Sequence, residues 1–371
     1  MRVLVVNAGS SSLKLRLLDD NDVLEQSADL PAGPSGLDTA ALEHAIADWT
    51  RPDAVGHRVV HGGNHFTGPV VVDDAVRKQL EDLVDLAPLH QPKSLAALDA
   101  VTAVLSSVPA VACFDTAFHA TLPAAAATYA IPREWREKYG IRRYGFHGLS
   151  HAYCSRRAAA LLGRPLAGLR MVTCHLGAGA SLAAVVDGRS VDTTMGFTPL
   201  EGLVMATRSG SVDPGLLLWL EEHEHLTPRD IATALEERSG LLALAGTADM
   251  REIEVATARD GPDAQLALDV YTHRLVAGIA AMTAATNGID VLVFTGGVGE
   301  RSTEVRRRAA DRLPYLGVAV DDERNVAAKP DAEITADGAQ VRTFVITARE
   351  DLQIADETRD VLAPPTAHPA R

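Results

Sequence analysis

The feature that most constrains the fold is a strand–turn–strand pattern that occurs twice in the chain. Residues 1–18 place the turn sequence NAGSSS between two apolar segments, and residues 171–188, MVTCHLGAGASLAAVVDG, repeat the scheme. Aligning Gly9 with Gly177 sets Asn7 against His175, and a shift of one residue then aligns the following Ser-Leu pairs. A single match of this length can also arise by chance, but it favours an internal duplication. The 371 residues likewise suggest two domains, each with its own core.

A third glycine-rich turn follows a buried strand later in the chain. The apolar residues 266–288 have the length of a helix that stops at Gly288, and IDVLVFTGGVGE then predicts a strand that runs into a turn. Two earlier segments, 74–87 and 94–105, have apolar residues on one helical face. One glycine turn after a strand is most often only a tight turn. Three of them favour a phosphate ligand, because their backbone N–H groups can point at an anion.

Composition and charge exclude several classes of protein. The formal charge of -14 argues against a general nucleic-acid-binding or anionic-membrane-binding surface, since both require a basic face. No apolar run is long enough to span a bilayer, and we expect a cytoplasmic protein. The cysteines Cys113, Cys154 and Cys174 lack metal-type spacing and are expected to be small buried hydrophobes. The tail APPTAHPAR has few apolar groups to bury and is expected to be mobile.

Four polar residues occur at glycine-punctuated ends of apolar segments, where open α/β sheets place their ligands. They are Arg58 in GHRVVHGG, Asp115 in CFDTAFH, His147 in RRYGFHGLSH and Arg208 in GFTPLEGLVMATRSGSVDPG. Each alone has an ordinary structural explanation, such as a surface ion pair, a capped turn or a satisfied core histidine. Together they indicate a site for a reaction of anions, because the arginines supply positive charge that the acidic chain otherwise lacks.

A series of motifs, in order over nearly the whole chain, resembles the acetate kinase family. The motifs are NAGSSSLK, GHRVVHGG, LAPLHQP, FDTAFH, YGFHGLSH, HLGAGAS, MGFTPLEGLVMATRSG, DMRE, FTGGVGE and AREDLQIA. The resemblance is specific because MGFTPLEG and YGFHG are long strings of low degeneracy. It implies an α/β fold of two duplicated actin-like (ribonuclease H-like) domains with an active-site cleft between them. The implied first domain holds residues 1–116 plus 351–371, and the second holds residues 117–350.

The resemblance also implies a reaction. This reaction is the reversible, direct in-line transfer of a phosphoryl group from ATP to acetate, giving acetyl phosphate and ADP, with Mg²⁺ or in its place Mn²⁺. The residues that match catalytic positions are Arg58, Asp115, His147 and Arg208, and those that match metal positions are Asn7 and Glu350. We expect Asp115 to orient its neighbours rather than to take a proton, because acetate is already ionised at neutral pH.

Further positions match the substrate and nucleotide sites of the family. A small apolar pocket for the acetate methyl group, next to Arg58, would comprise Val60, Leu89, Phe146 and Pro199. The nucleotide positions are Ser12, Lys14, His175, Leu176, Gly177, Ala178, Gly179, Asp249, Met250, Arg251, Gly297, Val298, Gly299, Glu300 and Arg301. The resemblance further implies a homodimer.

Several residues depart from the family pattern. Ala178 replaces the usual asparagine of the second turn, and Arg301, Arg349 and Asp351 also differ from the residues that the family favours. These substitutions leave the nucleotide preference open, because the arginines would add positive charge near the nucleotide and the metal.

Three alternative functions share much of this pattern. A propionate or butyrate kinase would have the same catalytic residues and differ only in the apolar pocket. A pyrophosphate-dependent acetate kinase is less favoured, because Gly297 leaves room for an adenosine. An actin-like nucleotide-binding or assembly protein is permitted by the fold, but it would have no need of Arg58, His147 and Arg208.

Overall fold

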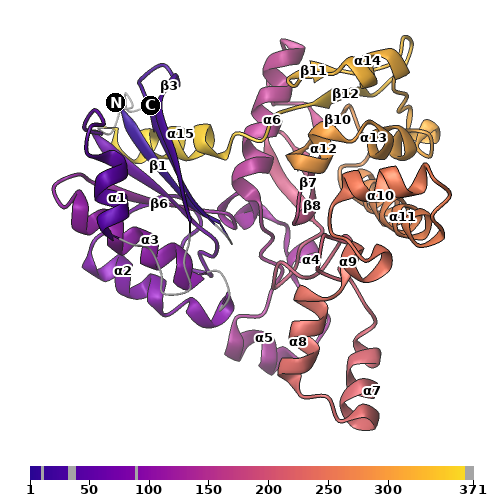
Figure 1. Cartoon of the computed structure of the whole chain (residues 1–371), viewed down its shortest axis with the longest axis horizontal. Helices are drawn as coiled ribbons and strands as arrows, with labels where there is room; N and C mark the ends of the chain where they lie inside the picture. Colours follow the sequence, from indigo (N-terminus) through magenta and orange to yellow (C-terminus); the bar gives the residue numbers. More distant parts are fainter. Residues whose placement is uncertain (10–11, 32–38, 88–90, 364–371) are drawn as a thin grey trace. The chain divides into compact units, whose positions relative to one another are not determined.

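The computed structural model describes residues 1–9, 12–31, 39–87 and 91–363. Leu89 of the predicted acetate pocket and the predicted mobile tail beyond Ala363 lie outside the described residues. The chain divides into two compact units (Figure 1), each of which is described by itself below. The first unit comprises residues 1–120 and 148–153 and everything from Arg349 onward; the second comprises residues 121–147 and 154–348.

The first unit contains a six-stranded sheet with the order β3-β2-β1-β4-β6-β5. Strands β1, β4 and β6 are parallel neighbours, while β2 and β3 continue from β1 as an antiparallel meander and β5 is antiparallel to β6. The strands are β1 (Val3–Ala8), β2 (Ser12–Leu18), β3 (Leu24–Pro31), β4 (Ala54–Val59), β5 (Val70–Val71) and β6 (Ala110–Phe114). The hairpin predicted at the start of the chain is therefore confirmed.

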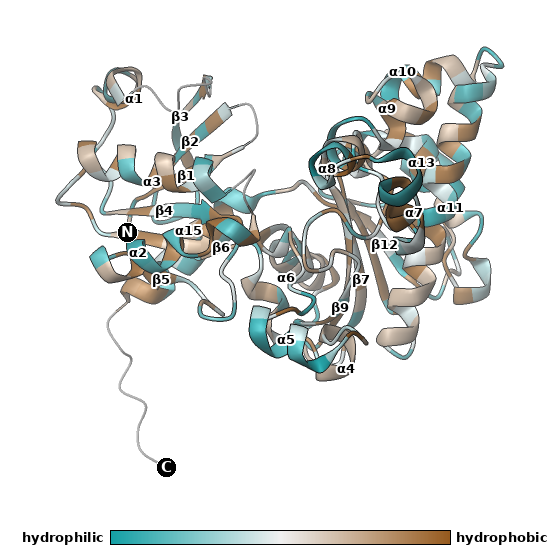
Figure 2. Ribbon diagram, turned by 90° about the horizontal axis from the view of Figure 1, so that it is seen from below, coloured by the Kyte–Doolittle hydropathy of each residue, from teal (hydrophilic) through white to brown (hydrophobic). Residues whose placement is uncertain are grey.

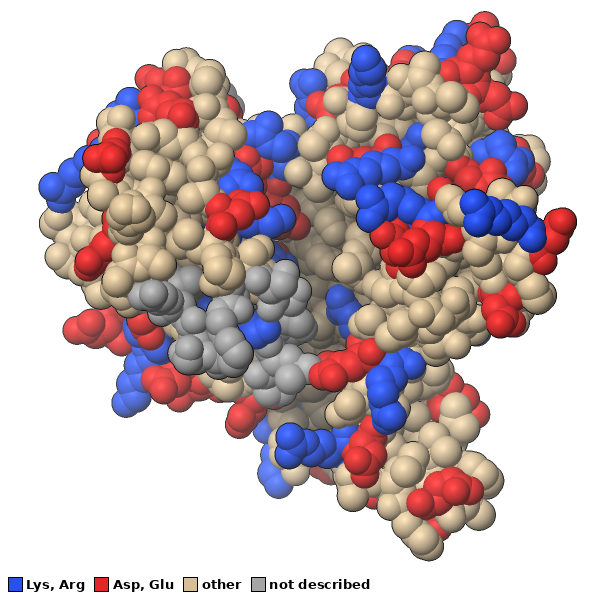
Figure 3. All heavy atoms as spheres, viewed as in Figure 1, with Lys and Arg blue, Asp and Glu red and all other residues tan. Residues whose placement is uncertain are grey.

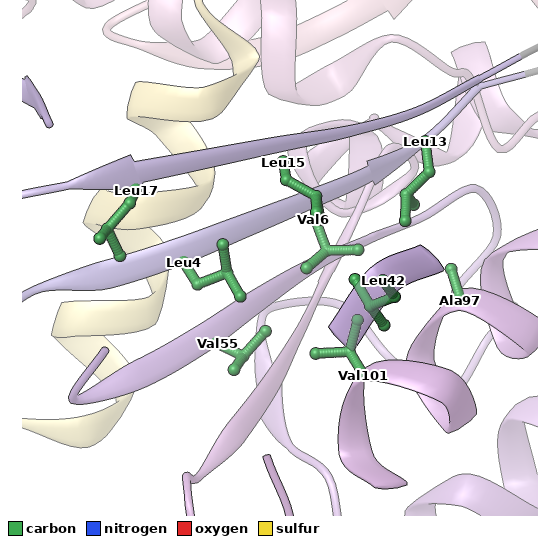
Figure 4. Close-up of a cluster of buried hydrophobic side chains, with 9 residues drawn as sticks. All are labelled: Leu4, Val6, Leu13, Leu15, Leu17, Leu42, Val55, Ala97 and Val101. Atoms are coloured by element: carbon green, nitrogen blue, oxygen red, sulfur yellow. The ribbon is translucent and has the colours of Figure 1, made fainter. Parts of the chain in front are cut away.

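Helices cover both faces of the first sheet. They are α1 (Thr39–Ile46), α2 (Asp74–Glu81), α3 (Gln91–Val104) and α15 (Glu350–Leu362). Side chains alternate between the faces of a strand, so Leu4 and Val6 of β1 pack with α1 and α3 (Figure 4), whereas Val3 and Val5 pack against Ile354 of α15. Both helices predicted in this region are present, but α2 ends at Glu81, six residues before the predicted end, and residues 84–86 form a separate 3-10 helix. Asp73 caps α2 by accepting a hydrogen bond from the Val76 N–H group.

The second unit contains a sheet with the order β11-β12-β10-β7-β8-β9. Its strands are β7 (Arg170–Leu176), β8 (Ala180–Val186), β9 (Arg189–Thr193), β10 (Val291–Thr295), β11 (Ala332–Glu333) and β12 (Arg342–Val345). Strands β7, β10 and β12 are parallel, β8 and β9 form an antiparallel meander from β7, and β11 is antiparallel to β12. Order and direction repeat those of the first sheet strand for strand, which confirms the duplication.

The one-residue shift in the sequence match has a structural origin. In the first hairpin Ala8 pairs with Leu13, whereas in the second Leu176 pairs with Ala180. Four residues (9–12) therefore separate the last paired positions of the first hairpin, and three (177–179) separate those of the second. Asn7 and His175 occupy the same position of their hairpins, and Lys14 faces Asn7 as Ser181 faces His175.

The second unit also contains helices, some of which pack on its sheet, and strand β7 of this sheet is drawn in hydrophobic colours in Figure 2. The helices are α4 (Ala124–Ala127), α5 (Arg133–Tyr139), α6 (Gly148–Leu162, of which residues 148–153 belong to the first unit), α7 (Pro214–Glu224), α8 (Pro228–Glu237), α9 (Gly240–Ala245), α10 (Met250–Thr257), α11 (Pro262–Ala285), α12 (Gly296–Arg301), α13 (Thr303–Ala310) and α14 (Asp322–Ala327). The predicted long helix is α11, which ends at Ala285, three residues before the expected Gly288. The third glycine turn is itself the short helix α12 directly after β10.

The burial of the cysteines and the distribution of surface charge match the expectations drawn from the composition. The three cysteines are buried, as predicted. Basic and acidic side chains are interspersed on the face shown in Figure 3, which carries no extended basic stripe. Within the described parts of the chain, no helix combines the length and the apolar character needed to cross a membrane.

Candidate active site

The first group of predicted site residues gathers at one edge of the first sheet. Asn7 lies near the end of β1, Arg58 near the end of β4, and Asp115 directly after β6. The carboxyl ends of neighbouring parallel strands meet at the same edge of a sheet, where such folds bind ligands. Glu350, the first residue of α15, joins them from the far end of the sequence. We call these four residues the first-unit cluster.

Hydrogen bonds connect all four members of the first-unit cluster. The Arg58 guanidinium donates to Asp115 through Nη2 (2.5 Å to Oδ2) and Nε (3.1 Å to Oδ1). Its Nε atom is also 3.8 Å from Glu350 Oε2. Asn7 Nδ2 donates to the same Glu350 oxygen at 3.0 Å, and Arg58 Nη1 lies 3.4 Å from Asn7 Oδ1. Asp115 thus occupies one edge of the guanidinium and leaves Nη1 with a single long contact.

The charges of this cluster are mutually dependent. Burial raises the pKa of Asp115 to about 6; Arg58 opposes this shift, and Glu350 acts in the same direction as burial. Burial alone would lower the pKa of Arg58, but Asp115 and Glu350 together hold that pKa above its ordinary value. Two carboxylates on one guanidinium leave the cluster with a net charge of about -1 when both are ionised.

The oxygen atoms of Asn7 and Glu350 fit a hard divalent cation. Mg²⁺ binds through one or two carboxylates, keeps several waters and requires oxygen ligands. The amide of Asn7 and the carboxylate of Glu350 are in direct contact, so their oxygens can turn to a shared ion. In the described part of the chain, no three His, Cys, Asp or Glu side chains are grouped as ligands for a fully protein-bound ion.

The second group of predicted residues lies in the second unit around the β7–β8 turn. His147 has a left-handed backbone (φ 56°) and precedes α6. Its Nδ1 atom is 3.0 Å from Ser181 Oγ, and its ring stacks on that of His175 with centroids 4.3 Å apart. The fully buried Ser181 pairs with His175 across the ladder. The second hairpin therefore holds the His147 ring by an edge contact and a face contact.

The side chain of Arg208 lies beside the same β7–β8 turn, but its hydrogen-bond partner is a backbone carbonyl. Its Nη1 atom donates to the carbonyl oxygen of Pro199 at 2.6 Å. Among the described residues, none places a carboxylate within ion-pair distance of Arg208, and burial lowers its pKa, with Glu236 opposing that shift. A Cβ atom added to Gly179 would lie 2.5 Å from Arg208 Nη2 and 3.2 Å from His147 Nε2. Gly179 thus lets the cationic arginine and the histidine approach one backbone turn.

The predicted nucleotide turns lie side by side at the end of β7. A Cβ atom on Gly296 would be 2.8 Å from the Leu176 carbonyl oxygen, so the start of α12 packs directly on the second hairpin. Glu300 Oε1 accepts hydrogen bonds from the Gly296 N–H group (3.2 Å) and the Ala348 N–H group (2.9 Å), which fixes the turn. Apart from its chain neighbours and the backbone of α12, none of the described residues has an atom within 4 Å of the position that a Gly297 Cβ would take. The backbone there faces open space.

The segment Asp249–Arg251 forms the start of α10. Asp249 caps the helix by accepting from the Arg251 N–H group at 2.9 Å and also pairs with the Arg251 guanidinium, whose hydrogen bonds lower the pKa of Asp249 to about 2. Met250 between them is buried. The hydrogen bond of Ser302 to Glu254 joins α10 to the residue that follows α12. The predicted positions 249–251 and 297–301 thus belong to one connected region.

The remaining predicted positions are distributed over both units. Ser12 and Lys14 lie on β2, where Lys14 is exposed. Val60, one residue beyond β4, is buried in the first unit. Phe146 is buried in the second unit, and Pro199 is partly buried there. Sequence reasoning assigned no role to Ser181; the available signal was its place in the second hairpin, opposite His175 as Lys14 is opposite Asn7.

Comparison with known proteins identifies the family of this chain. Residues 35–356 match the Acetokinase family. The chain belongs to that family. An acetate kinase of Methanosarcina acetivorans is 41% identical over 395 residues, which cover 97% of this chain and 97% of that protein.

Solved structures of acetokinase-family proteins share the fold. Porphyromonas gingivalis acetate kinase superposes with a TM-score of 0.90 at 35% identity, over 98% of this chain and 100% of that one. A propionate kinase from Francisella tularensis gives a TM-score of 0.90 at 34% identity, over 97% and 100%. Together with the repeated strand order, these likenesses confirm the predicted fold of two duplicated actin-like domains.

Two residues that were expected to depart from the acetokinase pattern, Arg349 and Asp351, form an ion pair with each other. Arg349 Nε and Nη2 donate to the Asp351 carboxylate, at 2.9 Å to Oδ1 and 2.9 Å to Oδ2. The extra positive charge expected from Arg349 is therefore balanced by the second substituted residue. Arg301 is exposed and is the departure whose charge remains at the third turn.

Proposed function

We propose that this chain is an acetate kinase, which transfers the γ-phosphoryl group of ATP to acetate and forms acetyl phosphate and ADP reversibly. The observation that carries the proposal is the state of Arg208. This partly buried guanidinium has no carboxylate partner among the described residues, and it shares the Gly179 turn with His147. A desolvated cation without a counter-ion is a favourable place for an anion. Membership of the acetokinase family supports a transferring phosphoryl group as that anion.

The reaction needs no proton transfer. An acetate oxygen attacks the γ-phosphorus in line, the bond to the β,γ-bridging oxygen breaks, and ADP leaves with that electron pair. Because the nucleophile is an ionised carboxylate, the protein has only to position it and to neutralise charge. Asp115 holds the Nε/Nη2 edge of Arg58, which leaves Nη1 for the substrate carboxylate. Asp115 therefore acts as an orienting group.

His147 and Arg208 stabilise the charge on the phosphoryl oxygens as transfer proceeds. The Nδ1 atom of His147 contacts Ser181, and its Nε2 atom lies on the side of Gly179 and Arg208. A hydrogen-bond donor and a guanidinium that are already fixed in place lower the barrier without reorganisation during the reaction. Arg208 is well suited because its planar group presents several donors to one anion.

Asn7 and Glu350 would hold a divalent cation, for which Mg²⁺ is the proposal and Mn²⁺ a substitute. The ion, when bound, would neutralise the β- and γ-phosphate oxygens. The contact of Asn7 with Glu350, and the net negative charge of the first-unit cluster, support this assignment.

ATP rather than pyrophosphate is the proposed phosphoryl donor. The glycine turns at residues 177–179 and 296–299 present backbone groups beside each other, and the space next to Gly297 leaves room for a base or ribose. Lys14 and the segment Asp249–Arg251 complete the proposed nucleotide site. The loss of an amide at Ala178 leaves the second turn with backbone donors only.

A donor and acceptor panel tests the proposal. Purified protein with Mg²⁺, ATP, acetate and hydroxylamine should form acetyl hydroxamate, and pyrophosphate in place of ATP should not support the reaction. Comparison of kcat/KM for acetate, propionate and butyrate decides between acetate kinase and propionate kinase, the second candidate, which the F. tularensis likeness favours. One methylene changes binding in an apolar pocket by about 1 to 3 kcal/mol, so propionate should be a weaker substrate. Absence of any acyl hydroxamate would disprove the proposal.

A homodimer is part of the proposal, and α7 is its proposed contact surface. Leu216, Leu218 and Trp219 on this helix have exposed fractions of 46%, 61% and 48%, and none of the helix residues is buried. Several large apolar side chains exposed on one helix are typical of an interaction surface. Light scattering should give twice the chain mass for the wild type and a monomer for Leu218→Asp. Val326→Asp is the control, because Val326 is the one large apolar side chain of α14, and its replacement should leave the mass unchanged.

A further inference from the structure

We propose that Tyr129, Arg143 and Glu201 form a loop brace, a set of positioning residues that holds residues 194–201 and thereby sets Arg208 relative to His147. This inference rests on the proposed function, because it assigns the brace a role in the same phosphoryl transfer. All of these residues belong to the second unit. None of the three brace residues is among the proposed substrate-contacting groups.

The carboxylate of Glu201 is the centre of the brace. Tyr129 donates its hydroxyl hydrogen to Glu201 Oε2, and Arg143 Nη2 donates to the other oxygen, Oε1, at 2.7 Å. Tyr129 Oη in turn accepts the N–H group of Phe197 at 2.9 Å. Both oxygens of Glu201 are therefore held by side chains that lie 72 and 58 residues away in the sequence.

Arg143 connects the brace to the beginning of the loop and to the segment that carries His147. Its Nη1 atom donates to the carbonyl oxygens of Thr194 (3.1 Å) and Met195 (3.0 Å). The next residue, Tyr144, donates its N–H group to the carbonyl of Gly196 at 3.0 Å. His147 follows three residues later. The loop is thus fixed to the backbone that leads into the catalytic histidine.

Gly196 shows how little freedom the loop has. A Cβ atom there would lie 1.8 Å from Glu201 Oε2 and 2.1 Å from Tyr129 Oη. The brace therefore passes directly over the loop backbone, and the loop cannot shift toward it. The hydroxyl stays protonated at physiological pH, because burial and then the Glu201 hydrogen bond raise the pKa of Tyr129.

The brace reaches Arg208 through Pro199. The Pro199 carbonyl accepts the Nη1 hydrogen bond of Arg208 at 2.6 Å, and Pro199 stands between Phe197 and Glu201, both of which the brace holds. The same network thus anchors the backbone before His147 and the carbonyl that orients Arg208. A displacement of about 1 Å in a positioning group can lower a rate 100-fold, so a loosened loop should slow transfer.

Tyr129→Phe and Glu201→Gln test the brace. We expect each to lower kcat by about 10- to 100-fold, with the KM for ATP and the affinity for ADP within twofold of wild type. The double variant should be no worse than the poorer single variant, because both changes break the same link. The matched control is Asp290→Asn, which removes a half-buried ion pair with Arg170 (2.7 Å) elsewhere in the second unit and should leave kcat unchanged.

A second readout separates the brace from the proposed function. Hydrogen–deuterium exchange of residues 194–199 should accelerate in both brace variants, while exchange in β7 stays as in wild type. If the wild type forms no acyl phosphate, the proposed function is lost and exchange alone decides the brace. Unchanged exchange of the loop overturns the inference. If the wild type is active, a kcat of the brace variants within twofold of the wild-type value also overturns the inference. A loss of activity that is fully explained by a smaller fraction of folded protein overturns it as well.

Discussion

Two arginines, Arg58 and Arg208, lie near glycine turns in the two halves of a duplicated fold, yet their electrostatic situations are opposite. Arg58 is paired with Asp115 and lies close to Glu350. Arg208 has only the Pro199 carbonyl as a side-chain hydrogen-bond partner among the described residues. In the proposed function, Asp115 orients Arg58 and leaves its Nη1 atom for the substrate carboxylate, whereas Arg208 binds the transferring phosphoryl group. The two arginines have similar places in the fold, so the presence or absence of a neutralising carboxylate is what separates their expected roles.

The largest expected effect is on activity, at Arg208. Arg208→Ala should lower kcat by about 10³-fold or more, the range typical of an arginine that stabilises a transferring phosphoryl group. Its melting temperature should not fall, because the variant removes a desolvated cation that no carboxylate compensates. Steady-state kinetics and thermal unfolding of the same preparation measure both quantities. Full acetate-dependent turnover by this variant would contradict the assigned role.

The next effect is on stability, at Arg58. Arg58→Ala should lower the free energy of unfolding by about 3 to 5 kcal/mol, since removal of one partner of a buried ion pair leaves the other charge uncompensated. Here the stranded group is Asp115, which is 1% exposed. Denaturant titration should show that Arg58→Ala/Asp115→Ala recovers part of the loss. Equal stability of the Arg58→Ala and Arg208→Ala proteins would remove the distinction between the two arginines.

A smaller effect is expected on the pH dependence of kcat/KM, through the ionisation of Asp115. The pKa of Asp115 is about 6 in the folded protein, above about 3.9 for an unfolded aspartate. The folded state thus favours the protonated form, and the stability that this contributes is present below pH 3.9 and lost as the pH rises through 6. Orientation of Arg58 requires the ionised form. We expect kcat/KM to fall about tenfold per pH unit below pH 6, and the Asp115→Asn protein, though weak, should lack this step.

The smallest effect concerns Ser181. Ser181→Ala removes the hydrogen bond to His147 Nδ1, and a bond of this kind contributes about 0.5 to 1.5 kcal/mol, which corresponds to roughly a 2- to 13-fold loss in kcat. Ser94→Ala is the control, because Ser94 is a buried serine of α3 in the first unit and should leave kcat unchanged. A loss as large as that of Arg208→Ala would mean that Ser181 itself contacts the reacting groups.

The sequence was informative where function follows from local position. Asn7, Arg58 and Asp115 could be predicted to meet because each stands at the carboxyl end of a parallel strand, and those ends share one edge. The hairpins at residues 3–18 and 170–186 could be predicted from the sequence, because strand alternation and glycine turns are local signals. The pairing of Asn7 with Lys14 follows from the hairpin register alone.

Contacts that depend on tertiary packing could not be predicted. Tyr129 and Glu201 are 72 residues apart, and no periodicity relates them. Arg306 is a stronger example: it stands in α13, is 1% exposed, and donates to the Gly299 and Glu300 carbonyls at 2.8 and 2.9 Å. Burial lowers its pKa to about 10, with Glu254 opposing. An arginine on a helix is normally expected at the surface, so only the structure reveals that it fastens the end of α12.

The position of α15 in the chain has a consequence for synthesis on the ribosome. This last helix supplies Ile354 and Ala355 to the core that begins with Val3 and Val5. When synthesis has reached residue 348, the second unit has all of its residues, while the first sheet still lacks the helix that covers one of its faces. Nascent chains usually fold from the amino terminus onward. Here the first sheet is completed only after the residues of the second unit have been made, and until then one of its faces lacks the cover that α15 provides.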